Sequence, residues 1–168
     1  VCLEKSYHLS FPNVFKHEDA YFMIPESHEN KTIDLYKFEE FPYKLKKVRT
    51  LVNNIDAVDS VILLKDRVYY LFTNLLSKEH DFHSGNLSIF TSNNLLEEAF
   101  ISKHNNPVES NPKYSRMAGH FFQENDKLFR VSQDCKNMYG YKVNIFQVNE
   151  LSGNYYRESL VKELFPPK

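Results

Sequence analysis

One pattern of apolar and polar residues occurs three times in this 168-residue chain, and it limits the possible folds more than any other feature. Each copy has an apolar pair, a polar turn, a second apolar run and a polar end. The copies span 13–26, 61–74 and 120–133 and align without a gap. The polar turn falls at Glu18-Asp19 in the first copy and at Asp66-Arg67 in the second. This pattern predicts three β-hairpins of one design.

Two further segments follow each hairpin. The first alternates apolar with polar residues, the period of a half-buried strand, and occurs at 33–36, 87–90 and 143–146. The second is more polar and occurs at 44–51, 96–103 and 155–164. These last runs are amphipathic enough for short helices, but as the fourth element of a repeat we interpret them as outer edge strands.

Four strands in a unit that repeats about every 50 residues are typical of a β-propeller blade. The sequence therefore predicts an all-β, propeller-like fold of three four-stranded antiparallel blades, at about 8–55, 56–107 and 114–165. A β-sandwich with coincidental hairpins is the alternative. Because a closed ring needs about four to eight blades, we expect one domain over 1–168 that is a fragment of a longer chain. Its exposed blade faces would meet the remaining blades or drive self-association.

Charge and cysteine content limit the possible partners. Lys and Arg total 21 and Asp and Glu total 22, and a net charge of −1 argues against a nucleic-acid binder. No apolar run approaches the roughly 18 residues of a membrane span. We interpret Cys2 and Cys135 as free thiols, and with no leader in this chain we expect a cytoplasmic location.

Neither a metal nor another cofactor is expected. Two cysteines are too few for a zinc site without histidines at ligand spacing. His80, Asp81 and His83 carry suitable donor atoms, but they lie in a polar segment that is typical of a solvated hairpin loop.

Several motifs resemble one known family. Segments 8–15 (HLSFPNVF), 21–26 (YFMIPE), 116–122 (RMAGHFF), 133–135 (QDC) and 139–141 (YGY) carry the likeness. They are similar to the N-terminal domain of the glucosamine inositolphosphorylceramide transferases and its bacterial relatives. That domain resembles the five-bladed propeller of family-43 glycoside hydrolases, so the resemblance implies a five-bladed ring and a fused transferase domain.

The same resemblance bears on catalysis. A family-43 hydrolase places a general base, a pKa-modulating Asp and a general acid in its first three blades. The matching positions here are Phe11, Asp59 and Met117. Because glycoside hydrolysis needs one group to protonate the leaving oxygen and another to activate water, ordinary hydrolysis is not expected.

Polar residues near the predicted strand ends are the candidate ligand-binding groups. We expect Asp59, Arg116 and His120 to share one polar cavity lined by Tyr or Phe, since the first strands of propeller blades meet at the centre. Structural roles stay open: Asp59 as a cap, Arg116 in a salt bridge to Asp59, and His120 as a hydrogen-bonded structural residue. The other candidates are His8, Glu26, Gln133, Asp134, Tyr139 and Tyr141.

Three functions fit these residues. The first is a non-hydrolytic module that recognises a carbohydrate or sugar-phosphate for a transferase-type protein acting on glycans or glycolipids. The second is a glycoside-acting enzyme with an altered family-43-like site. The third is a propeller scaffold for protein interaction. The scaffold gains support if Asp59, Arg116 and His120 are each engaged in contacts between blades.

Overall fold

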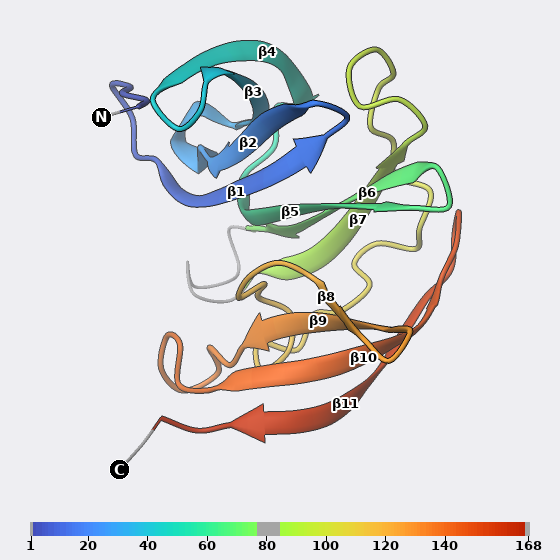
Figure 1. The fold of residues 1–168 in the computed structure, drawn as a ribbon. Coiled ribbons are helices and arrows are strands. Elements are labelled where there is room, and N and C mark those ends of the chain that lie inside the picture. The colour runs from blue at the N-terminus through green and yellow to red at the C-terminus, as the bar shows by residue number, and fades with distance from the viewer. Residues whose placement is uncertain (1, 77–84, 167–168) are drawn as a thin grey trace.

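The computed structural model describes residues 2–76 and 85–166 of the chain. The described residues form eleven β-strands and one short 3-10 helix, η1 (His28–Asn30), which confirms the all-β class. Figure 1 shows three antiparallel sheets one beneath another, from the N-terminal sheet at the top to the C-terminal sheet at the bottom. None of the helical structure in these residues is long and apolar enough to cross a membrane. The histidine-containing segment 80–83 lies outside the described residues.

The strands of each sheet are arranged in sequence order. The first sheet contains β1 (Ser10–His17), β2 (Ala20–Glu26), β3 (Thr32–Glu40) and β4 (Lys44–Asn53). The second contains β5 (Ala57–Lys65), β6 (Val68–Leu75) and β7 (Asn86–Ser92). The third contains β8 (Phe122–Glu124), β9 (Lys127–Gln133), β10 (Val143–Leu151) and β11 (Tyr156–Leu164).

The first two strands of every sheet form the same tight hairpin. The last pairs before the turns are His17 with Ala20, Lys65 with Val68, and Glu124 with Lys127. Each turn thus has two residues, and positive φ angles occur at Glu18, Asp66, Arg67, Asn125 and Asp126. Asp and Asn tolerate this conformation because their short polar side chains hydrogen-bond locally. The turn positions agree with the three-fold pattern of the sequence.

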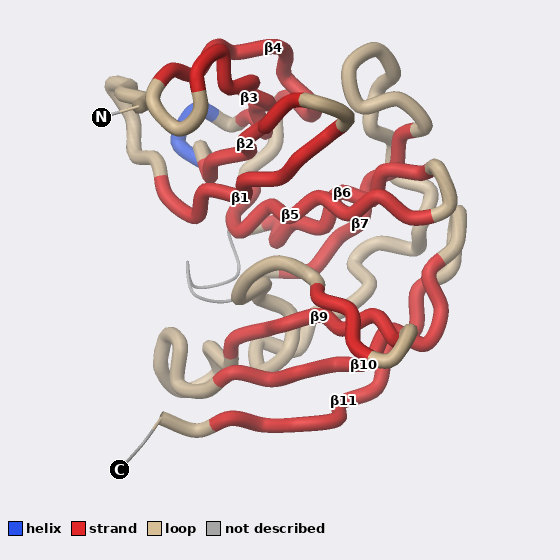
Figure 2. Tube along the Cα trace, in the orientation of Figure 1, coloured by secondary structure: helices blue, strands red, loops and turns tan. Residues whose placement is uncertain are grey.

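The fourth strand predicted at 96–103 does not form, so the second sheet has three strands. The Asn94 side chain accepts hydrogen bonds from the backbone N–H groups of Leu96 and Glu97, which holds this segment in a turn. One isolated bridge, Thr91 with Ile101, pairs this segment with the edge of β7, and a second, Leu87 with Glu109, pairs the chain that follows it. Figure 2 shows the long loop that results between β7 and β8.

Two apolar cores hold the sheets together, one on each face of the second sheet. Leu71 belongs to a cluster with Phe22 and Leu35 of the first sheet. The adjacent Phe72 belongs to a second cluster with Met117 and Leu151. Neighbouring residues of β6 point to opposite faces, so this strand is buried on both sides. Full burial of each such side chain contributes about 1.5–3 kcal/mol, which fixes the strand ends that form the site.

Candidate functional site

Side chains at the ends of β2 and β6 bind the start of the next sheet. The Glu26 carboxylate accepts a hydrogen bond from the backbone N–H of Asp59, with a 3.3 Å separation. Asn74 accepts one from the Met117 N–H at 3.1 Å and donates one to the Ser115 carbonyl at 2.9 Å. Both side chains are buried. The last position of the repeat, which holds Glu26 in the first copy and Asn74 in the second, therefore forms an inter-sheet clasp.

A β-bulge turns the start of the first strand in the first two sheets. The register shifts between Ser10 and Asn13 in β1, and between Val58 and Val61 in β5. Phe11 and Asp59 lie within these bulges at φ of 40° and 53°. A bulge re-aims side chains, and here it places the Asp59 carboxyl among residues of the third sheet and its preceding loop.

Asp59 and Arg116 form a buried ion pair. Nε of Arg116 donates to Oδ2 of Asp59 at 2.6 Å, and the two side chains are only 2% and 3% exposed. Burial raises the pKa of Asp59 to about 6, although the Arg116 charge opposes this shift. The nearby Glu26 charge raises the Asp59 pKa further, whereas a hydrogen bond from Gln133 lowers it.

Tyr139 covers the guanidinium of Arg116. The Arg116 Cζ lies 5.6 Å from the centre of the Tyr139 ring, within cation–π range, and Tyr139 is 51% exposed. Gly140 follows at φ 66°, a conformation that favours glycine. We call Glu26, Asp59, Arg116, Gln133 and Tyr139 the Asp59 cluster. It joins buried charge to an exposed aromatic ring.

His120 lies in a small hollow between the first and third sheets. Its Nδ1 is 3.0 Å from Nδ2 of Asn13, and burial lowers the His120 pKa, which favours the neutral ring as acceptor. Phe11, Pro12 and Gly119 line the same hollow, whose volume is about 130 Å³. Neither Asp59 nor Arg116 lines it. The structure thus places His120 apart from the ion pair with which we expected it to share a cavity.

The remaining candidates have other neighbours. His8 is exposed, and its backbone N–H donates to Glu29. Asp134 organises the loop between β9 and β10, because its side chain accepts a hydrogen bond from the Lys136 N–H and its backbone pairs with Lys142 and Tyr141. The Tyr141 ring contacts Phe165 edge-on. Of these three residues, Asp134 directly follows Gln133 of the Asp59 cluster in the chain.

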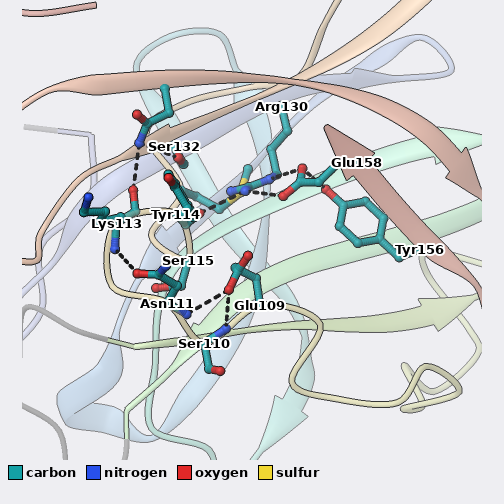
Figure 3. Close-up of polar contacts among 12 residues, drawn as sticks. Glu109, Ser110, Asn111, Lys113, Tyr114, Ser115, Arg130, Ser132, Tyr156 and Glu158 are labelled. Atoms are coloured by element: carbon teal, nitrogen blue, oxygen red, sulfur yellow. Dashed lines mark hydrogen bonds and ion pairs between the residues drawn. The ribbon is translucent and has the colours of Figure 1, made fainter. Parts of the chain in front are cut away.

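Sequence reasoning missed a second buried charge cluster, drawn in Figure 3. Arg130 is fully buried in β9, and its Nε and a terminal nitrogen donate to both oxygens of Glu158 in β11 at 2.8 and 2.5 Å. The Tyr156 hydroxyl also donates to Glu158, and Arg130 donates to the Tyr114 carbonyl at 2.9 Å. The cluster ties the loop before β8 to the outer strand of the third sheet.

A signal for this cluster was present in the sequence. In the three aligned copies, Arg130 occupies the slot that holds Met23 and Leu71 in the other two. A charged residue at a slot that is otherwise apolar predicts a buried partner. The partner, Glu158, lies in the outer strand, where the sequence pattern is weakest.

The three-sheet arrangement and its strand order define a β-propeller-type domain. The solved structures to which it is similar include family-43 glycoside hydrolases. The enzyme from Xanthomonas citri complexed with xylotriose matches with a TM-score of 0.66 at 6% identity, over 96% of this chain and 57% of that one. A thermostable family-43 glycoside hydrolase matches with a TM-score of 0.59 at 16% identity, over 95% of this chain and 54% of that one. At these identities the likeness shows the fold alone, in an arc that is not closed.

Sequence comparison identifies the family. The model for the N-terminal region of glucosamine inositolphosphorylceramide transferase 1 matches residues 1–166, so the chain belongs to that family. Glucosamine inositolphosphorylceramide transferase 1 of Oryza sativa subsp. japonica is 30% identical over 94% of this chain, and that of Arabidopsis thaliana is 29% identical over the same share. The chain spans 21% of the length of each relative.

Proposed function

We propose that this chain is a recognition module for a carbohydrate or sugar-phosphate within a transferase-type protein that acts on glycans or glycolipids. The observation that carries the proposal is the Asp59 cluster. Tyr139 presents an exposed ring directly over the buried Arg116–Asp59 pair. An aromatic ring binds the apolar face of a sugar, and adjacent charged groups bind its hydroxyl or phosphate groups.

The relatives support the chemical class of this ligand. The transferase relatives carry glucosamine and inositol phosphate in their names, and a family-43 structural relative was solved with xylotriose. A ligand on Tyr139 would bind a ring that is already positioned, because the Arg116 guanidinium beneath the ring is fixed by its ion pair with Asp59. Preorganised groups of this kind lose little conformational entropy when a ligand binds.

The proposed module is not a hydrolase of the ordinary family-43 type. Met117 is fully buried in the second core, and Phe11 packs against the same core. Met117 and Phe11 align with the general acid and the general base of family-43 hydrolases, and neither side chain can exchange a proton. Binding without bond cleavage is therefore the function that we propose for these residues.

An altered glycoside-acting enzyme is the second candidate, and one observation favours it. Glu26 and Asp59 are two buried carboxyl groups that interact, and the Asp59 pKa is raised to about 6. A buried carboxyl with a raised pKa beside a second carboxyl is a common acid–base arrangement.

We expect no release of nitrophenol from aryl arabinosides or xylosides, because only Asp59 of the three catalytic positions is a carboxylate. Absorbance of the released nitrophenol measures this activity. If the chain does turn over these substrates and Asp59→Asn abolishes the turnover, the enzyme is supported instead of the recognition module.

The scaffold candidate rests on the inter-sheet contacts. Asp59 pairs with Arg116, and Asn13 lies within hydrogen-bond distance of His120, so polar groups from different sheets engage one another. If these contacts were the whole role of the residues, no small ligand would bind at Tyr139. A binding measurement therefore separates the scaffold from the recognition module.

Titration of the isotopically labelled chain with glucosamine and with myo-inositol 1-phosphate, followed by NMR, is that measurement. We expect amide shifts around 133–141 and weaker binding in Tyr139→Ala. Tyr155→Ala is the matched control, because Tyr155 is exposed to a similar degree, 64%, and lies outside the Asp59 cluster. Equal affinity in both variants, or no shifts at saturating ligand, would remove the support for the proposal.

A further inference from the structure

A shallow hollow lies between β3 and the edge strand β4, far along the strands from the inter-sheet clasps. Its volume is about 660 Å³, which is within the range of ligand pockets. The residues that line it are Lys37, Phe38, Glu39, Lys46, Lys47 and Val48. We call it the β3–β4 hollow. None of the candidate residues discussed above contributes to it.

Two irregularities in the strand pairing border the hollow. The β3–β4 register shifts between Leu35 and Tyr36 and again between Phe38 and Glu40, so that Val48 and Glu39 have no cross-strand partner. Bulges of this kind bend a strand pair and are frequent beside functional sites. The paired stretch of β3 and β4 between these two shifts carries the lysines that line the hollow.

That segment places two lysines directly opposite each other, Lys37 in β3 and Lys46 in β4. Like charges in a cross-strand pair are destabilising. Within the described part of the chain, Lys37 forms no ion pair, and Lys46 lies 3.9 Å from a Glu39 carboxylate that pairs more closely with Lys44, at 2.9 Å. Lys47 is engaged with Asp34 at 2.8 Å. Among the described residues, the Lys37–Lys46 pair therefore has one carboxylate within ion-pair distance, that of Glu39, while Glu18 and Asp19 line a neighbouring hollow that Lys37 also borders.

Protection of an edge strand explains only part of this charge. Lysines on an exposed edge prevent pairing with other chains, and Lys44, Lys46 and Lys47 of β4 fit that role. Lys37 is in β3, which is paired on both sides, so its charge does not protect an edge. Edge protection therefore does not explain why an exposed lysine on this inner strand lies opposite another lysine.

We propose that the β3–β4 hollow binds a phosphate group between the ammonium groups of Lys37 and Lys46. A phosphate supplies further negative charge to this pair, and lysine binds it as a point charge with three donors. Two exposed aromatic rings, Phe41 and Tyr21, lie 4.4 Å apart between ring centres, and Phe41 also contacts the buried ring of Phe38, which lines the hollow. These rings would face the apolar part of the molecule that carries the phosphate. Both a soluble sugar-phosphate and a phospholipid headgroup have this chemistry.

The proposal is independent of the Asp59 cluster, and its test uses different residues. The labelled chain is titrated with inorganic phosphate at constant ionic strength, with chloride as the replaced anion. We expect amide shifts confined to 36–48. Lys37→Gln and Lys46→Gln should each weaken binding roughly threefold to fivefold, the scale of one exposed charge pair. Lys103→Gln, an exposed lysine in the β7–β8 loop, is the control of equal charge change.

Two further arms identify the source of the phosphate. One uses myo-inositol 1-phosphate, and the other uses phosphatidylcholine vesicles with and without phosphatidylinositol. If Lys37→Gln weakens binding in one of these arms and Lys103→Gln does not, the result supports the site and identifies the source of the phosphate. Absence of phosphate shifts at 36–48, or equal weakening by Lys103→Gln, would overturn the proposal. Tyr139→Ala should leave phosphate binding at the hollow unchanged. A failure of the Asp59 cluster as a sugar site can therefore be distinguished from a failure of the phosphate site.

Discussion

Asp59 shows how one side chain can link stability to a binding site. Its carboxyl is buried in a bulge beside Arg116, and burial exceeds the influence of the guanidinium, so the pKa rises to about 6. The folded state therefore holds a proton on Asp59 at pH values where the unfolded chain has released it. Protonation at this residue stabilises the fold, in the opposite direction to a typical salt-bridged carboxylate.

A pH series of unfolding free energies tests this account. The stabilisation from Asp59 is fully present below the unfolded pKa, near 4, and is lost as the pH rises through about 6. Relative to Asp59→Asn, the wild type should lose about 1 kcal/mol between pH 5 and pH 7. Urea denaturation of both proteins at each pH measures the difference. A difference that is constant with pH, or that grows in favour of the wild type, would show that the pKa is not raised.

Arg130 is the other residue whose burial has a large energetic consequence. It is fully buried and shares Glu158 with Tyr156, as Figure 3 shows. Arg130→Met should destabilise the fold by roughly 3–5 kcal/mol, because Glu158 is then buried without a counter-charge. The double variant Arg130→Met with Glu158→Gln should recover part of this loss, as measured by thermal unfolding. A double variant no more stable than Arg130→Met would contradict the uncompensated charge as the cause.

At the scale of the elements, the inter-sheet clasps position the site. Asn74 joins the end of β6 to the segment that carries Ser115, Arg116 and Met117. Because these hydrogen bonds hold the residues on either side of Arg116, the clasp also fixes where the Arg116 guanidinium lies. The stability of the clasp and the geometry of the Asp59 cluster are therefore coupled.

Asn74→Ala should lower the free energy of unfolding by roughly 2–4 kcal/mol, since a buried N–H and a buried carbonyl lose their partners. Asn149→Ala is the control, because Asn149 bonds Ser159 at the surface, and its loss should be within about 0.5 kcal/mol. Denaturant unfolding gives both values. If the two variants had equal stability, the clasp would not hold the sheets together.

The sequence predicted the elements better than the site. Tight turns at Asp66-Arg67 and the alternation at 143–146 follow local rules, so hairpins and inner strands were predictable. The prediction of a strand at 96–103 was wrong, because the Asn94 side chain stabilises a turn there that the amphipathic pattern does not reveal. The Asp59–Arg116 pair was foreseen as an alternative, since both lie near predicted strand starts.

Contacts that depend on the arrangement of whole sheets were not predictable. His120 was expected beside Arg116, but the first sheet approaches it through Asn13, and no local pattern encodes that approach. The Tyr139 ring reaches Arg116 because Gly140 and Asp134 shape the loop between β9 and β10. Long-range packing of this kind determines the site and has no signature in a single sequence.

At the scale of the whole molecule, the three sheets form an arc that resembles part of a family-43 propeller. The second sheet is covered by a core on each face, whereas the stacked rings of Phe122 and Phe129 lie in the third sheet with Phe122 exposed. The Asp59 cluster is built from all three sheets: Glu26 from the first, Asp59 from the second, and Gln133 from the third. We therefore expect ligand binding to depend on the assembled arc.

Crystals of the chain soaked separately with glucosamine and with myo-inositol 1-phosphate give the most direct test of the recognition site. We predict sugar density stacked on the exposed face of the Tyr139 ring, directly outside the buried Arg116–Asp59 pair. A phosphate in the β3–β4 hollow would be a separate, additional position. Ordered crystals with no density at Tyr139 at saturating ligand, or with the sugar only at the outer strands, would contradict the central claim that the Asp59 cluster recognises a carbohydrate.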